Sequence, residues 1–189
     1  DRITEFPIKE MVDELNRTPN LLTLDKDKEG RFWFIQDRLG LCVYSPDASG
    51  HRFAKADARD LQATIDARVS AASCFEKNGI WIVSPATGHI LLFVFEKGRI
   101  VRKRTISPPG HGRPAQIIEN GDGNLWMRYG TTIILTDRNG HAAAGLPDTC
   151  QFSCMAPYDG KQIIAAGKDR LFVLSGENGR LNCSPVTPV

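Results

Sequence analysis

A tryptophan recurs at one position of a repeated turn-and-strand pattern. In Asp122-Gly-Asn-Leu-Trp126 it lies three residues after a glycine and begins an apolar run. The pattern returns as Glu29-Gly-Arg-Phe-Trp33, as the shorter Asn78-Gly-Ile-Trp81, and as Asp159-Gly-Lys-Gln-Ile163, where isoleucine replaces tryptophan. The successive steps are 48, 45 and 37 residues, and all three tryptophans of the chain occupy this position. Repeats of about 40–50 residues with several strands each are typical of propeller blades.

Short apolar runs and glycine-containing turns fill each repeat. In the third repeat, expected strands cover residues 115–119, 125–128 and 132–136, with a fourth strand from His141. Turns at such short intervals favour an all-β meander over helices. The sequence therefore predicts a β-propeller-like array of about four blades, each of four antiparallel strands. The approximate blades are residues 20–66, 67–113, 114–148 and 149–189, preceded by an outer strand and a connection in residues 1–19.

The repeat also predicts where particular side chains lie. Trp33, Trp81 and Trp126 should occupy equivalent, largely buried positions between adjacent blades, where a large ring can bridge two sheets. Of the five cysteines, Cys42, Cys74 and Cys154 lie in predicted strands and are interpreted as small buried apolar residues. The cation-rich segment Arg99–Ile106 is expected to be a solvated outer strand, with anion binding as the less favoured alternative.

Four such blades either close into a ring or form an arc of a larger propeller. The chain is accordingly interpreted as a single propeller domain or a propeller fragment. An arc would expose apolar sheet faces, which drive association, so a homodimer is a possible state.

Charge and hydropathy exclude several classes of partner. The net charge is +2, from 24 lysines and arginines against 22 aspartates and glutamates, so nothing favours nucleic acid or an anionic membrane surface. The longest apolar run, Ile90–Phe95, is far too short to span a bilayer. Attachment to a membrane is therefore expected only through other parts of a longer protein.

The patterns that suggest metal or catalytic chemistry are weak. Asp25–Gly30 begins like a calcium-binding EF-hand loop, but Gln36 stands where a bidentate glutamate is needed, which favours a charged hairpin turn. His51 and His141 hold the same place in their repeats, so repetition explains them better than a metal site. His111 lies in a proline-rich loop with no identifiable acid or nucleophile partner. The sequence predicts no catalytic constellation, no metal site and no cofactor.

A ligand site is expected at one end of the blades. If the strands run from inner to outer, the turns between second and third strands and the links between blades share one face, around the central channel. We call this face the mouth end. Its charged and aromatic residues would suit a polyhydroxylated or anionic ligand, although solvated loop charge is the alternative for each residue alone. The candidate ligand-binding residues are Asp37, Arg38, Arg113, Tyr129, Lys168 and Asp169.

Two stretches carry a resemblance to a known family. Lys28–Trp33, followed by Leu39–Asp47, resembles the two-component regulator propeller repeat, and Gly121–Trp126 is the next best match. The resemblance implies a non-enzymatic sensor, the periplasmic or extracytoplasmic input domain of a hybrid two-component regulator that responds to glycan fragments or another small ligand. Streptogramin-lyase-like propellers share the Gly-Asn-Leu-Trp run, so the alternative is a metal-dependent lyase that uses His111.

Overall fold

The computed structural model describes residues 21–27, 29–36, 39–47, 50–65, 72–73, 79–84, 87–109, 112–146, 150–177 and 180–186. Within these residues the chain forms four antiparallel sheets of four strands each, which we call blades 1 to 4. Blade 1 comprises β1 (Leu21–Lys26), β2 (Phe32–Gln36), β3 (Gly40–Asp47) and β4 (Gly50–Lys55). Blade 2 comprises β5 (Ala72–Ser73), β6 (Gly79–Val83), β7 (Ile90–Glu96) and β8 (Arg99–Ile106). Blade 3 comprises β9 (Gln116–Glu119), β10 (Leu125–Tyr129), β11 (Thr132–Thr136) and β12 (Ala142–Gly145), and blade 4 comprises β13 (Cys154–Pro157), β14 (Ile163–Ala166), β15 (Leu171–Glu177) and β16 (Arg180–Pro185).

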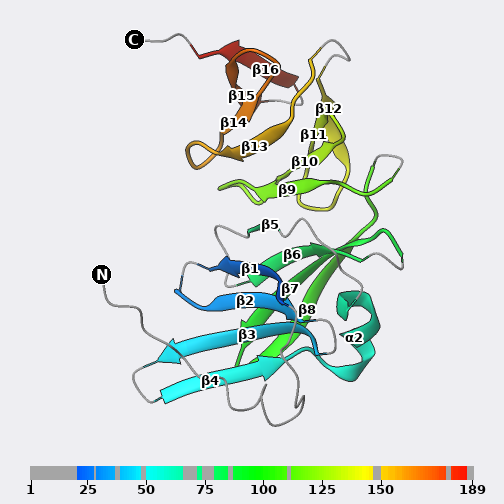
Figure 1. Ribbon diagram of the computed structural model, residues 1–189. Coiled ribbons are helices and arrows are strands. Elements are labelled where there is room, and N and C mark those ends of the chain that lie inside the picture. The colour runs from blue at the N-terminus through cyan, green and yellow to red at the C-terminus, as the bar shows by residue number, and fades with distance from the viewer. Residues whose placement is uncertain are drawn as a thin grey trace.

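The blades follow one another in an arc. The innermost strand of blade 3, β9, contacts β5 of blade 2 on one side and β13 of blade 4 on the other. Blades 1 and 4 lie at opposite ends of the described structure (Figure 1). The predicted all-β architecture is confirmed for the described residues, and there it has the form of an open arc. The exact limits of the four repeat units stay a prediction.

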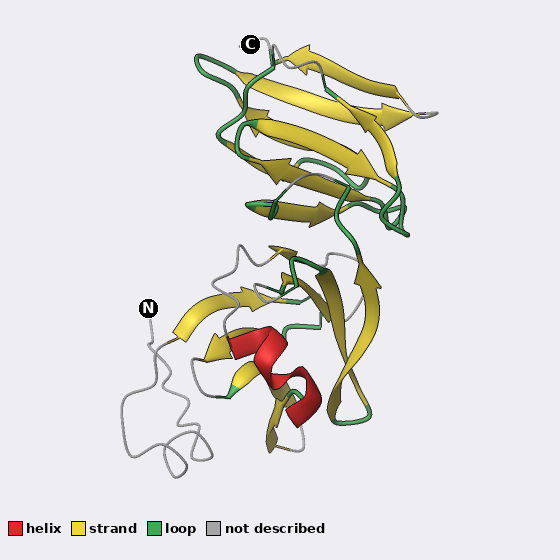
Figure 2. Cartoon of the chain, turned by 90° about the vertical axis from the view of Figure 1, so that its right-hand side faces the viewer, coloured by secondary structure: helices red, strands yellow, loops and turns green. Residues whose placement is uncertain are grey.

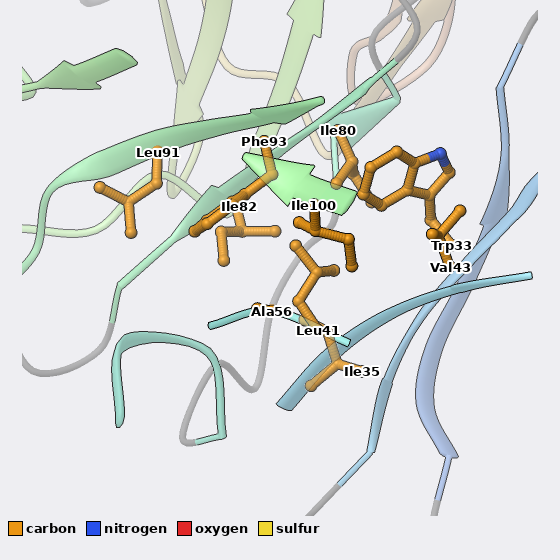
Figure 3. Packing of buried hydrophobic residues seen from close by; sticks show 10 residues of the cluster. All are labelled: Trp33, Ile35, Leu41, Val43, Ala56, Ile80, Ile82, Leu91, Phe93 and Ile100. Atoms are coloured by element: carbon orange, nitrogen blue, oxygen red, sulfur yellow. The ribbon is translucent and has the colours of Figure 1, made fainter. Parts of the chain in front are cut away.

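The tryptophans lie in the interfaces between blades, as the repeat predicted. Trp33 of blade 1 packs in one cluster with Ile80 and Phe93 of blade 2 (Figure 3). Trp81 of blade 2 and Trp126 of blade 3 pack in the same way against the blade that follows each of them. None of the three rings is more than 1% exposed. The same residue type thus fills each of the three junctions.

The fourth repeat departs from the sequence alignment by one residue. Ile163 packs in the cluster that contains Trp126, so it faces back toward blade 3. Ile164 points to the opposite face of the sheet and holds the register of the tryptophans. The reason is the turn before it: Gly160 comes one position earlier in its five-residue turn than Gly123 does in its own. Counting from the glycine therefore selected the wrong isoleucine.

Among the described residues, the β-structure is interrupted by a helix that the sequence did not predict. The helix α2 (Ala58–Ile65) lies in the link between blades 1 and 2 and contacts β3 (Figure 2). It packs closely on Gly40, where an added Cβ atom would lie 2.3 Å from the Thr64 hydroxyl oxygen. Glycine at this position therefore admits the helix against the end of blade 1.

The cysteines divide between buried and exposed positions. Cys42 is fully buried in β3, as predicted. The prediction for Cys154 was wrong in one respect: it lies in a strand, β13, but its side chain is exposed because it points away from blade 3. Cys74 lies outside the described residues.

The cation-rich strand β8 is an outer strand, as predicted. Arg99, Arg102 and Lys103 are exposed along it. Two of these cations form ion pairs within the chain, with 3.3 Å between Arg102 Nε and Asp60 Oδ1 and 2.6 Å between Lys103 Nζ and Glu96 Oε2. These contacts fit the interpretation of a solvated, charged edge.

A five-residue turn of one kind recurs in three places within the described part of the chain. Its first residue, Asp27, Asn120 or Asp137, accepts with Oδ1 from the backbone N–H groups two and four residues later, over 2.8–3.0 Å. Its fourth residue is a glycine with φ of 81°, 78° and 89° in the three turns. A left-handed backbone of this kind suits glycine because it has no Cβ atom. The turn is therefore specified by Asp or Asn at its first position, whose short side chain accepts the hydrogen bonds, and by a glycine three residues later.

The turn at Asp27 explains the segment that resembles a calcium loop. Asp27 Oδ2 accepts from Arg31 Nε over 2.7 Å and from Trp33 Nε1 over 2.8 Å. Both oxygens of this buried carboxylate thus bind donors of the chain itself. The charged hairpin turn, the interpretation favoured from the sequence, is what the structure contains.

Blades 3 and 4 are joined at both ends of their innermost strands. The Gln116 side chain of β9 accepts from Met155 N of β13 over 3.0 Å and donates to the Met155 carbonyl oxygen. At the other end, Gly121 N donates to the Gly160 carbonyl oxygen. The bonds to Met155 occupy backbone groups of the edge strand β13, and the bond from Gly121 to Gly160 joins the turns that follow β9 and β13. Together they fix the spacing of the two blades.

The indole N–H groups of two equivalent tryptophans differ in their partners. Trp81 Nε1 donates across the blade junction to Glu119 Oε2 over 3.0 Å. Trp126 Nε1 is buried and, within the described part of the chain, has no acceptor. At the register of Glu119, blade 4 carries Pro157, whose side chain offers no acceptor.

This difference predicts unequal costs for the same substitution. We expect Trp81→Phe to lower the free energy of unfolding by about 1–3 kcal/mol more than Trp126→Phe, because only the first removes a hydrogen-bond donor from a buried carboxylate. Both changes remove similar apolar volume, so each is the control for the other. Chemical denaturation of the two variants measures the difference, and equal losses would contradict the assigned roles of the two indoles.

Candidate functional site

The described surface is hollowed between blades 3 and 4, at the end opposite the mouth end. A hollow of about 230 Å³ lies between the first turns of the two blades. A second hollow, of about 390 Å³, adjoins it and shares Asp159, Gly160 and Gln162 with it. We call the two together the turn hollow. Its polar and aromatic lining includes Glu119, Asn120, Asp122, Tyr158, Asp159 and Gln162.

Backbone-directed hydrogen bonds shape both walls of the turn hollow. On the blade 3 side, Asn120 Oδ1 accepts from Asp122 N over 3.0 Å and from Asn124 N over 2.9 Å. On the blade 4 side, Asp159 Oδ1 accepts from the backbone N–H groups of Lys161 and Gln162, each over 2.9 Å. With the bond from Gly121 to Gly160, both walls are held before any ligand arrives.

The electrostatics of the turn hollow are mainly acidic. The backbone N–H groups of Lys161 and Gln162 hold the pKa of the Asp159 carboxyl below its ordinary value. Asp159 is therefore ionised at neutral pH and acts only as an acceptor. Lys161 Nζ lies 3.4 Å from Asp122 Oδ2 across the second hollow. Three carboxylates and one ammonium group at this place disfavour anionic ligands.

Three side chains of the turn hollow have groups left for a ligand. Tyr158 is 60% exposed beside Asp159. Among the described residues, the Tyr158 hydroxyl, Asp159 Oδ2 and the Gln162 side-chain amide have no hydrogen-bond partner. The three together offer an aromatic face, an ionised acceptor, and an amide that both donates and accepts. This combination suits a ligand with an apolar face and several hydroxyl groups.

The structure brings four of the six sequence-predicted residues to one end of blades 3 and 4. Backbone hydrogen bonds join their segments there: Ala115 N to Arg128 O over 2.7 Å, Phe152 N to Thr131 O over 2.8 Å, and Ser153 N to Ala166 O over 2.9 Å. The four residues beside these bonds are Arg113, Tyr129, Lys168 and Asp169. Asp37 and Arg38 lie outside the described residues.

The four residues differ in their exposure and in their contacts. Arg113, Lys168 and Asp169 are exposed. Asp169 accepts from Arg170 Nε over 3.1 Å and from Nη2 over 2.9 Å, and these hydrogen bonds hold the pKa of its carboxyl below the ordinary value. Tyr129 is half-buried and its hydroxyl donates to Met127 Sδ over 3.4 Å. Ligand binding by this group stays a prediction.

Sequence reasoning missed the turn hollow. Its residues belong to the turns of the repeat, where polar side chains are expected simply because they are solvated. The available signal was Tyr158, an aromatic residue directly before the turn Asp159-Gly160. Nothing local in the sequence indicates that this turn faces the one at Asn120.

The described residues also bear on metal binding, on catalysis by histidine and on membrane insertion. The part of the chain that the structure describes contains no group of three or more His, Cys, Asp and Glu side chains placed to hold a metal ion. His141 Nδ1 lies 3.1 Å from Asp137 Oδ2 within its own exposed turn. His111 lies outside the described residues. No helix of the described residues has the length and apolar character needed to cross a membrane.

Comparison with known proteins defines the class of fold. No protein-family model matches the chain, and no curated protein matches it. Several solved structures do match, at low identity. The gluconolactonase XC5397 from Xanthomonas campestris is 19% identical over 83% of this chain and 56% of its own, with a TM-score of 0.56. Streptogramin B lyase is 14% identical over 90% of this chain and 55% of its own, with a TM-score of 0.55.

The extracellular domain of a two-component system is among the similar structures as well. The extracellular domain of the hybrid two-component system BT4673 from B. thetaiotaomicron is 14% identical over 97% of this chain and 27% of its own, with a TM-score of 0.55. Together these likenesses show that the chain has a β-propeller fold. It spans about half the length of the gluconolactonase and lyase chains. Proteins with different functions share this fold, so function has to be argued from the site.

Proposed function

We propose that the chain is a non-enzymatic, ligand-binding part of an extracytoplasmic sensor, the input region of a hybrid two-component regulator that recognises glycan fragments. The observation that carries the proposal is the turn hollow, where exposed Tyr158 stands beside an ionised carboxylate and a free amide. The likeness of the fold to an extracellular sensor domain and the resemblance of the repeats support it.

The chemistry of the turn hollow indicates the class of ligand. An aromatic ring stacks on the apolar face of a sugar ring, while a carboxylate and an amide bind its hydroxyl groups. The excess of carboxylates favours neutral or cationic sugars over uronic acids and sulfated glycans. The hollow is large enough for a ligand of one to a few sugar rings.

The mouth end is the second place where a ligand could bind. Arg113, Tyr129, Lys168 and Asp169, with Asp37 and Arg38, would present more cations there than the turn hollow does. An anionic glycan therefore fits the mouth end better, and a neutral glycan fits the turn hollow better. The charge of the ligand that binds separates the two sites.

Two tyrosine substitutions test where the ligand binds. With a neutral oligosaccharide found by calorimetric screening, we expect Tyr158→Ala to weaken binding by about 1–3 kcal/mol, because it removes the stacking face. Tyr129→Ala is the matched control at the mouth end and should leave this binding unchanged. Thermal denaturation shows whether each variant is folded. If only Tyr129→Ala weakens binding, the site lies at the mouth end, and the turn hollow is the wrong choice.

The rival function is a propeller enzyme. Two of the similar structures are enzymes, a gluconolactonase and a streptogramin B lyase, which keeps this class open. Cleavage of a lactone, a cyclic ester or a polysaccharide that requires a divalent metal, and that is lost in His111→Ala, would overturn the sensor proposal. Binding without turnover of the same compounds supports it.

A further inference from the structure

Two cysteines from distant parts of the sequence meet at the junction of blades 3 and 4. Cys150 lies in the link between the blades, and Cys183 lies on the outermost strand, β16. Both side chains are partly buried and pack against the cluster that contains Trp126. Both thiols are free in this structure.

Neighbouring contacts hold the two cysteines in place. Phe152, two residues after Cys150, bonds through its N–H to the Thr131 carbonyl oxygen over 2.8 Å. Its ring meets the Phe172 ring edge to face, with the centroids 5.6 Å apart. Phe172 and Leu174 of β15 pair with Pro185 and Cys183 of β16, respectively. Cys183 therefore lies diagonally next to Phe172 on the same face of the sheet. The link segment thus packs against β15, the strand next to the one that carries Cys183.

The two thiols face the same junction, because both side chains pack against the cluster that contains Trp126. The outer strands of the two blades, β12 and β16, also contact each other there. Burial raises the pKa of the Cys183 thiol, and the neighbouring Cys150 raises it further. A disulfide requires Cα atoms about 4.4–6.8 Å apart, a spacing that is common between residues packed in one cluster.

We propose that Cys150 and Cys183 form a disulfide bond that fastens blade 4 to blade 3. The oxidant is a disulfide compound or a dithiol oxidase. One thiolate attacks a sulfur atom of the oxidant, and the other cysteine thiolate then displaces the leaving thiolate from the mixed disulfide. Two cysteine thiols lose two protons and two electrons, and the oxidant disulfide is reduced to two thiols. The bond forms without ligand and does not depend on the proposed sensor function.

The other cysteines serve as internal references. Cys154 lies on the opposite face of blade 4 and is exposed, so it is the thiol that should react with partners outside the chain. Cys42 is buried in blade 1, far along the sequence from both members of the pair. The raised pKa of Cys183 also predicts that the bond forms slowly at neutral pH and faster as pH rises.

The experiment uses the purified chain with Cys154→Ser, which removes the exposed thiol. The folded protein is incubated with oxidised glutathione, and its free thiols are then blocked. It is digested without reduction and analysed by mass spectrometry. We expect one linked pair of peptides, containing Cys150 and Cys183, and a mass lower by two hydrogen atoms. Closing the intervening loop should raise the melting temperature by about 5–10 °C relative to the reduced protein.

The added substitution Cys150→Ser is the matched control and should abolish both the linked peptides and the oxidation-dependent rise in melting temperature. The measurement on the Cys154→Ser protein does not depend on how well this control folds. If Cys150 and Cys183 both stay free to alkylation under conditions that fully oxidise dithiothreitol, the proposal is wrong. It is also wrong if Cys183 is linked to Cys42 or Cys74 instead.

Discussion

Replacing Asp27 with alanine is expected to lower the free energy of unfolding by about 3–5 kcal/mol, the usual cost of breaking a buried ion pair from one side. The carboxylate binds two backbone N–H groups, the Arg31 guanidinium and the Trp33 indole. Its side chain is fully buried. Removing it leaves Arg31 with Glu29, at 2.8 Å, as its remaining carboxylate partner among the described residues.

The matched variant is Asp27→Asn, because Asn120 forms the same turn in blade 3 with an amide oxygen. Asparagine at position 27 should keep the turn but weaken the bond to the guanidinium, and so cost less than alanine does. Chemical denaturation of the two variants gives both free energies. If the two substitutions cost the same, the charge on Asp27 is unimportant and the ion pair adds nothing beyond the turn.

The outer face of blade 4 is expected to make the chain self-associate. Ile164 and Val173 pair across this face, and Leu171 next to them is 47% exposed. In blades 1, 2 and 3, the corresponding face of the sheet packs against the next blade. Sedimentation velocity over a range of concentrations should therefore show a species larger than the monomer.

Leu171→Lys should weaken that association by about tenfold or more, because one buried leucine side chain contributes about 1.5–3 kcal/mol. Tyr158→Lys is the control, since Tyr158 also has a large exposed side chain but lies at a turn beside the face rather than on it. A chain that sediments as a monomer at every concentration would contradict the assignment of this face as the adhesive one.

Much of the architecture was predictable because it repeats. Trp33, Trp81 and Trp126 mark one register, and the turns before Trp33 and Trp126 are defined by a short polar residue and a glycine three residues later. Where the turn changed, the prediction failed: blade 4 places its glycine one residue early, so Ile164 and not Ile163 holds the register. Cys154 was expected inside because burial is inferred from strand character, and the sequence does not show that the sheet around Cys154 has an uncovered face.

The turn hollow and the helix could not be predicted for a different reason. The helix α2 is short, and its packing depends on a glycine, Gly40, that lies far before it in the sequence. The turn hollow forms between Asn120 and Tyr158, residues of two turns that meet only when blades 3 and 4 dock. Neighbours of this kind are set by tertiary packing, and no local pattern records them.

The two ties between blades 3 and 4 have a consequence for recognition. Gln116 hydrogen-bonds to the backbone of Met155 at one end of the inner strands, and Gly121 hydrogen-bonds to Gly160 at the other. The turn hollow between the blades therefore has a fixed width. A ligand meets a preformed, rigid site that does not close around it. Such a site selects ligands by size. A ligand that is too large cannot widen it, and one that is too small leaves part of the site unfilled. Binding also costs the protein little conformational entropy, because the site is already ordered. The association rate should therefore be limited by diffusional encounter and not by rearrangement of the protein.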